Sequence, residues 1–175
     1  MVLSIIFDAM TAEKKYILDK AVAARKLKRM AYEILENNTG EEYIVLAGIR
    51  ESGSVVARNI QQLLSAISSV KTDLITITLD KHQPKDVTVN KDIDFTGKVI
   101  IVIDDVANSG KTLLYALKPF LAYQPKKIQT LVLVERSHKT FPVHPDYVGL
   151  SMATTLQEHI YVEVDDKDVL GAFIQ

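Results

Sequence analysis

Hydrophobic residues recur along the chain with two different spacings. Apolar positions three or four residues apart predict helices over Asp19–Asn37 and Ser54–Ser68. Continuous apolar runs, which are typical of strands buried on both faces of a parallel sheet, lie at Tyr43–Ile49, Lys98–Asp104 and Lys127–Val134. Because the two patterns alternate, we expect an α/β fold with a mostly parallel central sheet and helices on both faces.

Weaker patterns fill the gaps between these elements. Leu74–Leu79 alternates apolar residues with threonines and predicts a strand. The polar stretch Asp80–Phe95 lacks periodicity and is interpreted as a long flexible loop. Gly110–Tyr123 has helical spacing, and Pro119 is expected to kink this helix near its end. Short strands are predicted at Tyr147–Leu150, Ile160–Val164 and Val169–Phe173.

The composition narrows the classes of protein. The 175 residues correspond to a single domain over 1–175, and 47% hydrophobic residues are enough for a packed core. A formal net charge of -1 argues against a protein that coats nucleic acid through its bulk charge. The chain has no cysteine, which excludes disulfides and thiolate chemistry. The apolar stretches are too short to span a bilayer, and Val2–Phe7 lacks the basic flank of a signal peptide, so we expect a cytoplasmic protein without a membrane partner.

Candidate chemistry gathers where the strand Lys98–Asp104 ends. Parallel sheets bind ligands beyond the carboxyl ends of their strands, and this strand leads into two acids, Asp104 and Asp105. A turn with short hydroxyl residues follows, in which Gly110 permits close approach of the backbone to a ligand. The N–H groups of such a turn, and the start of the helix after it, can surround a phosphate.

Three interpretations of this stretch compete. Gly110-Lys111-Thr112 matches the end of a nucleoside triphosphatase P-loop, but that motif requires glycine where Asp105 stands. Carboxylates would also repel a triphosphate unless a metal intervened. An acidic strand end followed by an ordinary helix cap is the second interpretation. The third, which we favour, is a ribose 5-phosphate site: the carboxylates accept hydrogen bonds from two vicinal sugar hydroxyls, and the turn holds the phosphate.

Val99–Leu113 resembles the phosphoribosyl diphosphate motif of the type I phosphoribosyltransferases. That motif is an apolar strand, two acids, three variable residues and then Thr-Gly-any-Thr, and Ser109 keeps the hydroxyl of its first threonine. The resemblance implies that Asp104 and Asp105 are catalytic and hold the ribose hydroxyls. It also implies Mg2+ as a cofactor, which Asp104 and Asp105 contact through its water ligands. The residues implied in binding the 5-phosphate are Ala107, Asn108, Ser109, Gly110, Lys111 and Thr112.

Roughly four-fifths of the chain, with the first ten residues outside it, resembles one branch of this family, the pyrimidine operon attenuator proteins that are also uracil phosphoribosyltransferases. The most specific stretch runs from Arg136-Ser137-His138-Lys139 to Pro145-Asp146-Tyr147-Val148-Gly149. The resemblance implies two substrates, phosphoribosyl diphosphate and a nucleobase, with uracil favoured and a purine as the alternative. The short C-terminal strands would form part of the base site. Its implied residues are Arg136, His138, Tyr147, Val148 and Gly149, with Tyr147 stacking on the base.

The same resemblance makes Gly48–Gly53 the loop that grips the diphosphate, through Arg50, Glu51, Ser52 and Gly53. Two residues depart from the family, which usually has a small hydroxyl residue in place of Glu51 and a basic one in place of Ser52. An acid facing diphosphate weakens the grip unless it turns outward or reaches metal. In the loop that follows, Lys81, His82 and Lys85 are expected to cover the diphosphate.

Partners are less constrained by the sequence. The first helix carries five basic residues, and in the attenuator family this neighbourhood contributes to an RNA-binding face. The solvated side of an amphipathic helix explains the same charges, so an RNA-binding regulator remains the alternative function. A homodimer is the family expectation, with the arm Val2–Phe7 as a contact. The basic residues are Lys20, Arg25, Lys26, Lys28 and Arg29.

Overall fold

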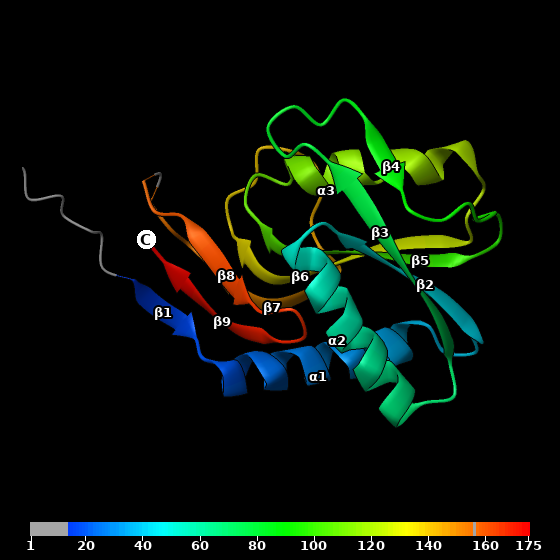
Figure 1. Cartoon of the computed structure of the whole chain (residues 1–175), viewed down its shortest axis with the longest axis horizontal. Coiled ribbons are helices and arrows are strands. Elements are labelled where there is room, and N and C mark those ends of the chain that lie inside the picture. Colours follow the sequence, from blue (N-terminus) through cyan, green and yellow to red (C-terminus); the bar gives the residue numbers. More distant parts are fainter. Residues whose placement is uncertain (1–13, 156) are drawn as a thin grey trace, which may run out of the picture.

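Two sheets organise the chain in the computed structural model, which describes residues 14–155 and 157–175 (Figure 1). The larger sheet has the order β4-β3-β2-β5-β6-β7, and all neighbours are parallel except β4 and β3. Its strands are β2 (Tyr43–Ile49), β3 (Lys71–Leu79), β4 (Val87–Val89), β5 (Val99–Ala107), β6 (Lys127–Arg136) and β7 (Tyr147–Met152). The predicted α/β fold class is therefore confirmed.

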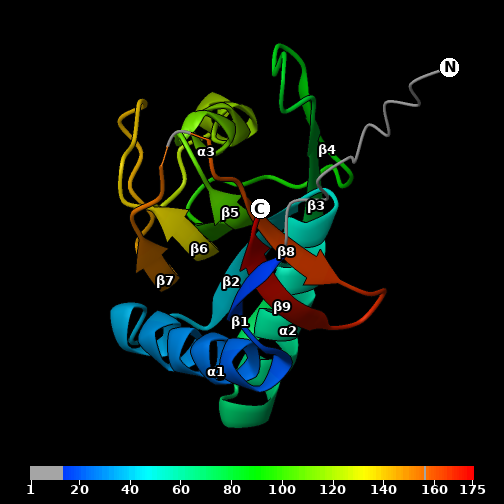
Figure 2. The same cartoon turned by 90° about the vertical axis from the view of Figure 1, so that its left-hand side faces the viewer.

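Helices cover both faces of the larger sheet (Figure 2). α1 (Lys20–Asn37) and α2 (Ser52–Ile67) pack on one face, and α3 (Lys111–Ala116) with the 3-10 helix η1 (Lys118–Ala122) packs on the other. Successive residues of the inner strands point to opposite faces, so each face has its own hydrophobic cluster. Burial on both faces explains why these strands are continuous apolar runs.

The start of α1 follows from its cap. The Asp19 carboxylate accepts a 2.7 Å hydrogen bond from the Val22 N–H, which satisfies one of the free donors of the first turn. At the other end, buried Asn38 donates to the Ile34 carbonyl at 2.8 Å. The helix predicted between Asp19 and Asn37 is thus confirmed, and its apolar stripe packs on the sheet as the spacing indicated.

The smaller sheet lies beside the carboxyl ends of the parallel strands (Figure 1). It has the order β1-β9-β8, with β1 (Lys15–Leu18), β8 (Ile160–Val164) and β9 (Val169–Ile174) antiparallel. Its inner face joins the hydrophobic cluster of α1 and α2. Two of these strands match the predictions, whereas β1 escaped notice because four residues are too few to show a period.

Three predicted elements need correction. The strand predicted to end at Asp104 continues as β5 to Ala107, so Asp105 also lies in the strand and not in the loop after it. The predicted helix of residues 110–123 is two elements, because α3 ends at Ala116 and Pro119 occupies the first turn of η1, where a missing N–H is tolerated. The stretch predicted as a loop contains β4.

Two sequence-based expectations concern the termini and membranes. The predicted arm Val2–Phe7 lies outside the described residues. None of the helices within residues 14–155 and 157–175 has the length and apolar character needed to span a bilayer.

Candidate active site

A pocket of about 190 Å³ opens where β5 ends. One wall is the turn that joins β5 to α3, and the other walls are Lys81, Asp105 and Ile160 at the start of β8. All residues predicted to bind a 5-phosphate line it together: Ala107, Asn108, Ser109, Gly110, Lys111 and Thr112. The structure thus brings the predicted phosphate turn and one of the two acids into a single concave surface.

The phosphate turn, residues 107–112, is held in shape from outside. The Ser109 carbonyl accepts hydrogen bonds from the N–H groups of Thr140 and Phe141, at 3.0 and 2.9 Å. Gly110 has φ +84°, and a Cβ there would lie 3.2 Å from the carbonyl oxygens of Phe141 and Val143. Left-handed backbone in a crowded position explains why glycine is required. The segment between β6 and β7 therefore braces the turn.

The two acids differ in exposure. The Asp104 side chain is buried, and that of Asp105 is 15% exposed. Asp104 Oδ1 accepts the Asp105 N–H at 3.0 Å, while Asp104 Oδ2 has no hydrogen-bond partner among the described residues. Burial, and next the charge of Asp105, raise the pKa of Asp104 well above its usual range. An unpartnered buried carboxylate oxygen is costly, so it is available to accept a bond from a ligand.

Lys81, which follows β3, reaches the acidic pair. Its Nζ lies 3.2 Å from Asp104 Oδ1 and 3.5 Å from Asp105 Oδ1. Burial opposes the charged ammonium, but the carboxylates of Asp104 and Asp105 outweigh it and raise the pKa of Lys81. The sequence singled out Lys81, His82 and Lys85 as a cover for the diphosphate. Only Lys81 of these three lines the pocket of the phosphate turn.

The predicted diphosphate loop lies at the end of β2, beside the acidic pair. A Cβ on Gly53 would lie 2.8 Å from the Ile103 carbonyl oxygen and 3.0 Å from Asp104 Cα, so glycine lets the first turn of α2 lie against β5. The side chains of Arg50 and Glu51 are 61% and 85% exposed and lie 3.9 Å apart. The peptide bond between them is cis. Glu51 thus projects into solvent.

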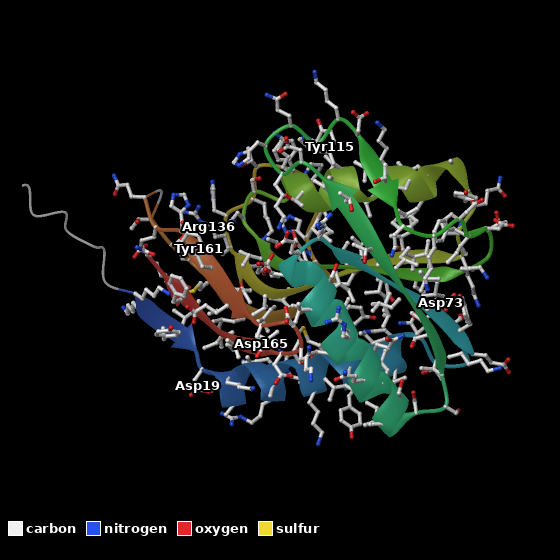
Figure 3. The ribbon with its side chains drawn as sticks, in the orientation of Figure 1. Asp19, Asp73, Tyr115, Arg136, Tyr161 and Asp165 are labelled. Carbon is white, nitrogen blue, oxygen red and sulfur yellow. The ribbon has the colours of Figure 1, made fainter. Side chains whose placement is uncertain are left out.

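The residues predicted to bind the base lie in two places: Arg136 and His138 at and after the end of β6, and Val148 and Gly149 in β7. Arg136, at the end of β6, donates from its guanidinium to the Thr155 carbonyl, and His138 is exposed. In the view of Figure 3, Arg136 and Tyr161 both lie on the side of the smaller sheet. The carbonyl oxygens of Val148 and Gly149 accept bonds from Arg29 of α1, at 2.8 and 3.1 Å.

The prediction that Tyr147 stacks on the base is wrong. Its side chain is 1% exposed and lies in the hydrophobic cluster of α1 and α2. Its hydroxyl accepts a hydrogen bond from Asn38 at 3.3 Å. β7 enters the sheet at Tyr147, and alternation along the strand turns this ring inward.

Sequence reasoning missed Lys139 as a brace of this region. Its side chain is only 3% exposed, and its ammonium donates to Glu135 Oε2 at 2.7 Å and to the Arg136 carbonyl. A buried lysine is unusual unless it is paired, and this pair fixes the start of the segment that braces the phosphate turn. The four-residue spacing of Glu135 and Lys139 was visible in the sequence, but no helix was predicted there that would have made it meaningful.

Comparison with known proteins identifies the family. The family model described as phosphoribosyl transferase domain matches residues 14–167. The chain belongs to the phosphoribosyltransferase family. The resemblance read from the acidic pair and the phosphate turn is thereby confirmed.

Relatives of similar length exist in several bacteria. The chain is 33% identical over 171 residues to the bifunctional protein PyrR of Staphylococcus saprophyticus, covering 92% of this chain and 98% of that protein. It is 36% identical over 173 residues to the bifunctional protein PyrR of Clostridium novyi, with 91% and 97% covered.

Solved structures share the fold. The hypoxanthine phosphoribosyltransferase of Trypanosoma cruzi matches with a TM-score of 0.75 at 15% identity, over 91% of this chain and 95% of that one. A hypoxanthine-guanine phosphoribosyltransferase of Bacillus anthracis matches with a TM-score of 0.68 at 24% identity, over 84% and 85%. At these identities the likeness establishes the fold of this phosphoribosyltransferase and leaves its base open.

Proposed function

We propose that this phosphoribosyltransferase transfers the ribose 5-phosphate of phosphoribosyl diphosphate to uracil and releases diphosphate. One observation carries the proposal: the phosphate turn and Asp105 line a single pocket, with buried Asp104 beside it. A sugar phosphate presents hydroxyls and a phosphate, which are the partners that carboxylates and N–H groups prefer.

Binding follows from the two kinds of group in the pocket. The N–H groups and hydroxyls of the phosphate turn hold the 5-phosphate. Asp105 and the free Asp104 Oδ2 accept hydrogen bonds from the two sugar hydroxyls. The sugar is thus held by its 5-phosphate at one end and by its hydroxyls at the other. Because the segment between β6 and β7 braces the turn, the phosphate end has a fixed orientation.

The chemical step is displacement at the anomeric carbon: the base nitrogen forms a bond to this carbon as the bond to diphosphate breaks, and the proton of that nitrogen passes to the released diphosphate or to water. Positive charge develops on the sugar ring, as in glycoside hydrolysis. The carboxylates of Asp104 and Asp105 stabilise this charge, and they do so strongly because the site is largely shielded from water.

The acidic pair suits Mg2+ held through its water ligands. Within the described ranges, no group of three or more His, Asp or Glu side chains is arranged to bind a metal directly. Two adjacent carboxylates, one with an unpartnered buried oxygen, can accept hydrogen bonds from the waters that Mg2+ retains. When bound, Mg2+ neutralises charge on the diphosphate and makes it a better leaving group.

The choice of uracil rests on the resemblance of residues 133–155 to the attenuator branch. Arg136, His138, Val148 and Gly149 are the proposed base side, with Val148 and Gly149 acting through backbone groups. A purine acceptor is the alternative, since one scaffold serves several bases in this family.

The test is to incubate the protein with phosphoribosyl diphosphate and Mg2+, add one base at a time and measure diphosphate release. Uracil should give release above the rate without base. Diphosphate release with hypoxanthine, guanine, adenine or orotate, and not with uracil, would identify that base as the acceptor in place of uracil. No release with any of the five bases would overturn the enzymatic proposal.

RNA binding is a second candidate function, favoured by the outward charges of α1. Lys20, Arg25 and Lys28 of this helix are exposed, and Lys26 is half-buried. Binding of pyrimidine-operon leader RNA should weaken steeply with salt if these residues contact phosphates. Absence of binding at low salt would remove this candidate.

We also propose a cytoplasmic homodimer. Both properties rest on the resemblance to the attenuator branch, with Val2–Phe7 as a contact between subunits. Light scattering of the full chain, and of a variant lacking residues 1–10, tests this. A monomeric full chain would overturn the dimer.

A further inference from the structure

An ammonium group already occupies the acidic pair. Lys81 Nζ lies 3.2 and 3.5 Å from the Oδ1 atoms of Asp104 and Asp105 and so bridges both carboxylates. The Lys81 side chain is 44% exposed, whereas those of the two aspartates are 1% and 15% exposed. A tethered cation thus reaches from the surface into a buried anionic site.

The segment that carries Lys81 is folded down over the pocket by two further bonds. Lys111 of the phosphate turn donates from Nζ to the His82 carbonyl at 3.2 Å. Lys118 donates from Nζ to the Lys85 carbonyl at 2.9 Å. Inside the segment, the N–H groups of His82 and Gln83 donate to Asp80 Oδ1, at 2.8 and 3.2 Å. Residues 80–86 therefore close as an ordered unit.

The same carboxylates are needed by the substrate. Lys81 contacts the Oδ1 atom of Asp105, a carboxylate proposed to accept a sugar hydroxyl, and the Oδ1 atom of Asp104, whose other oxygen, Oδ2, is proposed to accept the second hydroxyl. We propose that Lys81 is a latch: it neutralises the acidic pair and holds residues 80–86 closed in the empty enzyme, and phosphoribosyl diphosphate with its divalent cation displaces it. This inference rests on the proposed function for the identity of the displacing ligand.

A latch of this kind has a defined energetic consequence. The ion pair of Lys81 with Asp104 and Asp105 must break before substrate binds. The free energy needed to break it is therefore subtracted from the free energy of substrate binding. Because Lys81 is partly exposed, water screens the pair and the effect is moderate. A residue that instead grips the diphosphate would add to the affinity. The two roles predict changes of opposite sign.

The first experiment needs no substrate. Hydrogen exchange of the His82, Gln83 and Lys85 amides, which all donate hydrogen bonds within the segment, reports its closure. In Lys81→Met these amides should exchange about fivefold faster. Lys85→Met is the matched control, because its exposed ammonium forms no ion pair among the described residues, and its exchange should match that of the wild type. Lys81→Arg keeps the charge and should keep the protection.

The second experiment is calorimetric titration with phosphoribosyl diphosphate and Mg2+. Lys81→Met should bind about threefold more tightly than the wild type, which corresponds to about 0.7 kcal/mol. Lys85→Met should not bind more tightly. Weaker binding by Lys81→Met would overturn the latch and make Lys81 a ligand of the diphosphate. Unchanged exchange in Lys81→Met would also overturn it, whether or not the enzyme transfers ribose to uracil.

Discussion

The two anion-facing segments of the site differ in how far the protein itself fixes them. The phosphate turn lines one pocket, and its Ser109 carbonyl accepts hydrogen bonds from the segment between β6 and β7. The diphosphate loop carries two exposed side chains, Arg50 and Glu51, which among the described residues form an ion pair only with each other, at 3.9 Å. With the binding sites proposed above, the 5-phosphate, which stays bound through the reaction, has a preformed site, whereas the diphosphate, which leaves, has a less constrained one. Preorganisation is concentrated where orientation matters most.

The largest expected effect lies between the two segments, at the acidic pair. Changing both Asp104 and Asp105 to asparagine keeps their size but removes the negative charge that faces the sugar ring. Turnover in the diphosphate-release assay should fall at least tenfold, or about 1.4 kcal/mol in the barrier. Asp86→Asn, which changes an exposed aspartate of residues 80–86, serves as the control. Wild-type turnover in the double variant would refute the assignment.

Gly110→Ala tests whether the backbone of the phosphate turn can adapt to a side chain at this position. Gly110 and Gly40 share φ +84°, but a Cβ on Gly40 would have nothing within 4 Å. Gly40→Ala should therefore lower the free energy of unfolding only by the left-handed cost of about 1–2 kcal/mol. Gly110→Ala should lower it further and weaken ribose 5-phosphate binding about tenfold by calorimetry. Equal effects of the two variants on stability would mean that the turn has room to adapt.

Asp104→Asn should separate stability from activity. Since burial raises the pKa of Asp104, its ionised form is disfavoured in the folded protein, and stability is lost as the pH rises through that pKa. Lys81 can return to water when its partner is removed, because it is partly exposed. The variant should gain on the order of 1 kcal/mol over the wild type at pH 8 and lose this advantage near pH 3. Denaturant unfolding at both pH values measures it, and an advantage larger at pH 3 would contradict the argument.

Glu51→Gln tests the diphosphate loop and should have the smallest effect. Glu51 is 85% exposed, so solvent screens its repulsion of diphosphate. The KM for phosphoribosyl diphosphate should fall about twofold at low salt and be unchanged at high salt. Glu42→Gln, at the opposite end of β2, should have no effect at either salt concentration. A tenfold change would mean that Glu51 contacts the diphosphate or its metal.

Local signals in the sequence predicted local structure well. The cap at Asp19 and the apolar run of β2 depend on neighbouring residues, and both elements lie within a residue of their predicted bounds. Short elements such as β1 and β4 carry too few residues for a period. The phosphate turn could be predicted from the sequence because all the residues proposed to bind the phosphate are consecutive.

Contacts between distant segments were the part that the sequence could not supply. Lys81 was expected over the diphosphate, yet it reaches the acidic pair, 23 and 24 positions further along the chain, because β3 and β5 end at the same edge of the sheet. The inward turn of Tyr147 depends on where β7 enters the sheet, and a single-residue shift would reverse it.

The bonds from Thr140 and Phe141 to the Ser109 carbonyl involve main-chain atoms alone. Such bonds do not depend on which side chains the two residues carry. The side chains of Thr140 and Phe141 can therefore be exchanged for those of other residues that have a backbone N–H, and the two bonds that brace the phosphate turn stay intact. Gly110 and Lys139 must be kept, because a methyl group at Gly110 would push the segment away and the buried Lys139–Glu135 pair fixes the start of the segment.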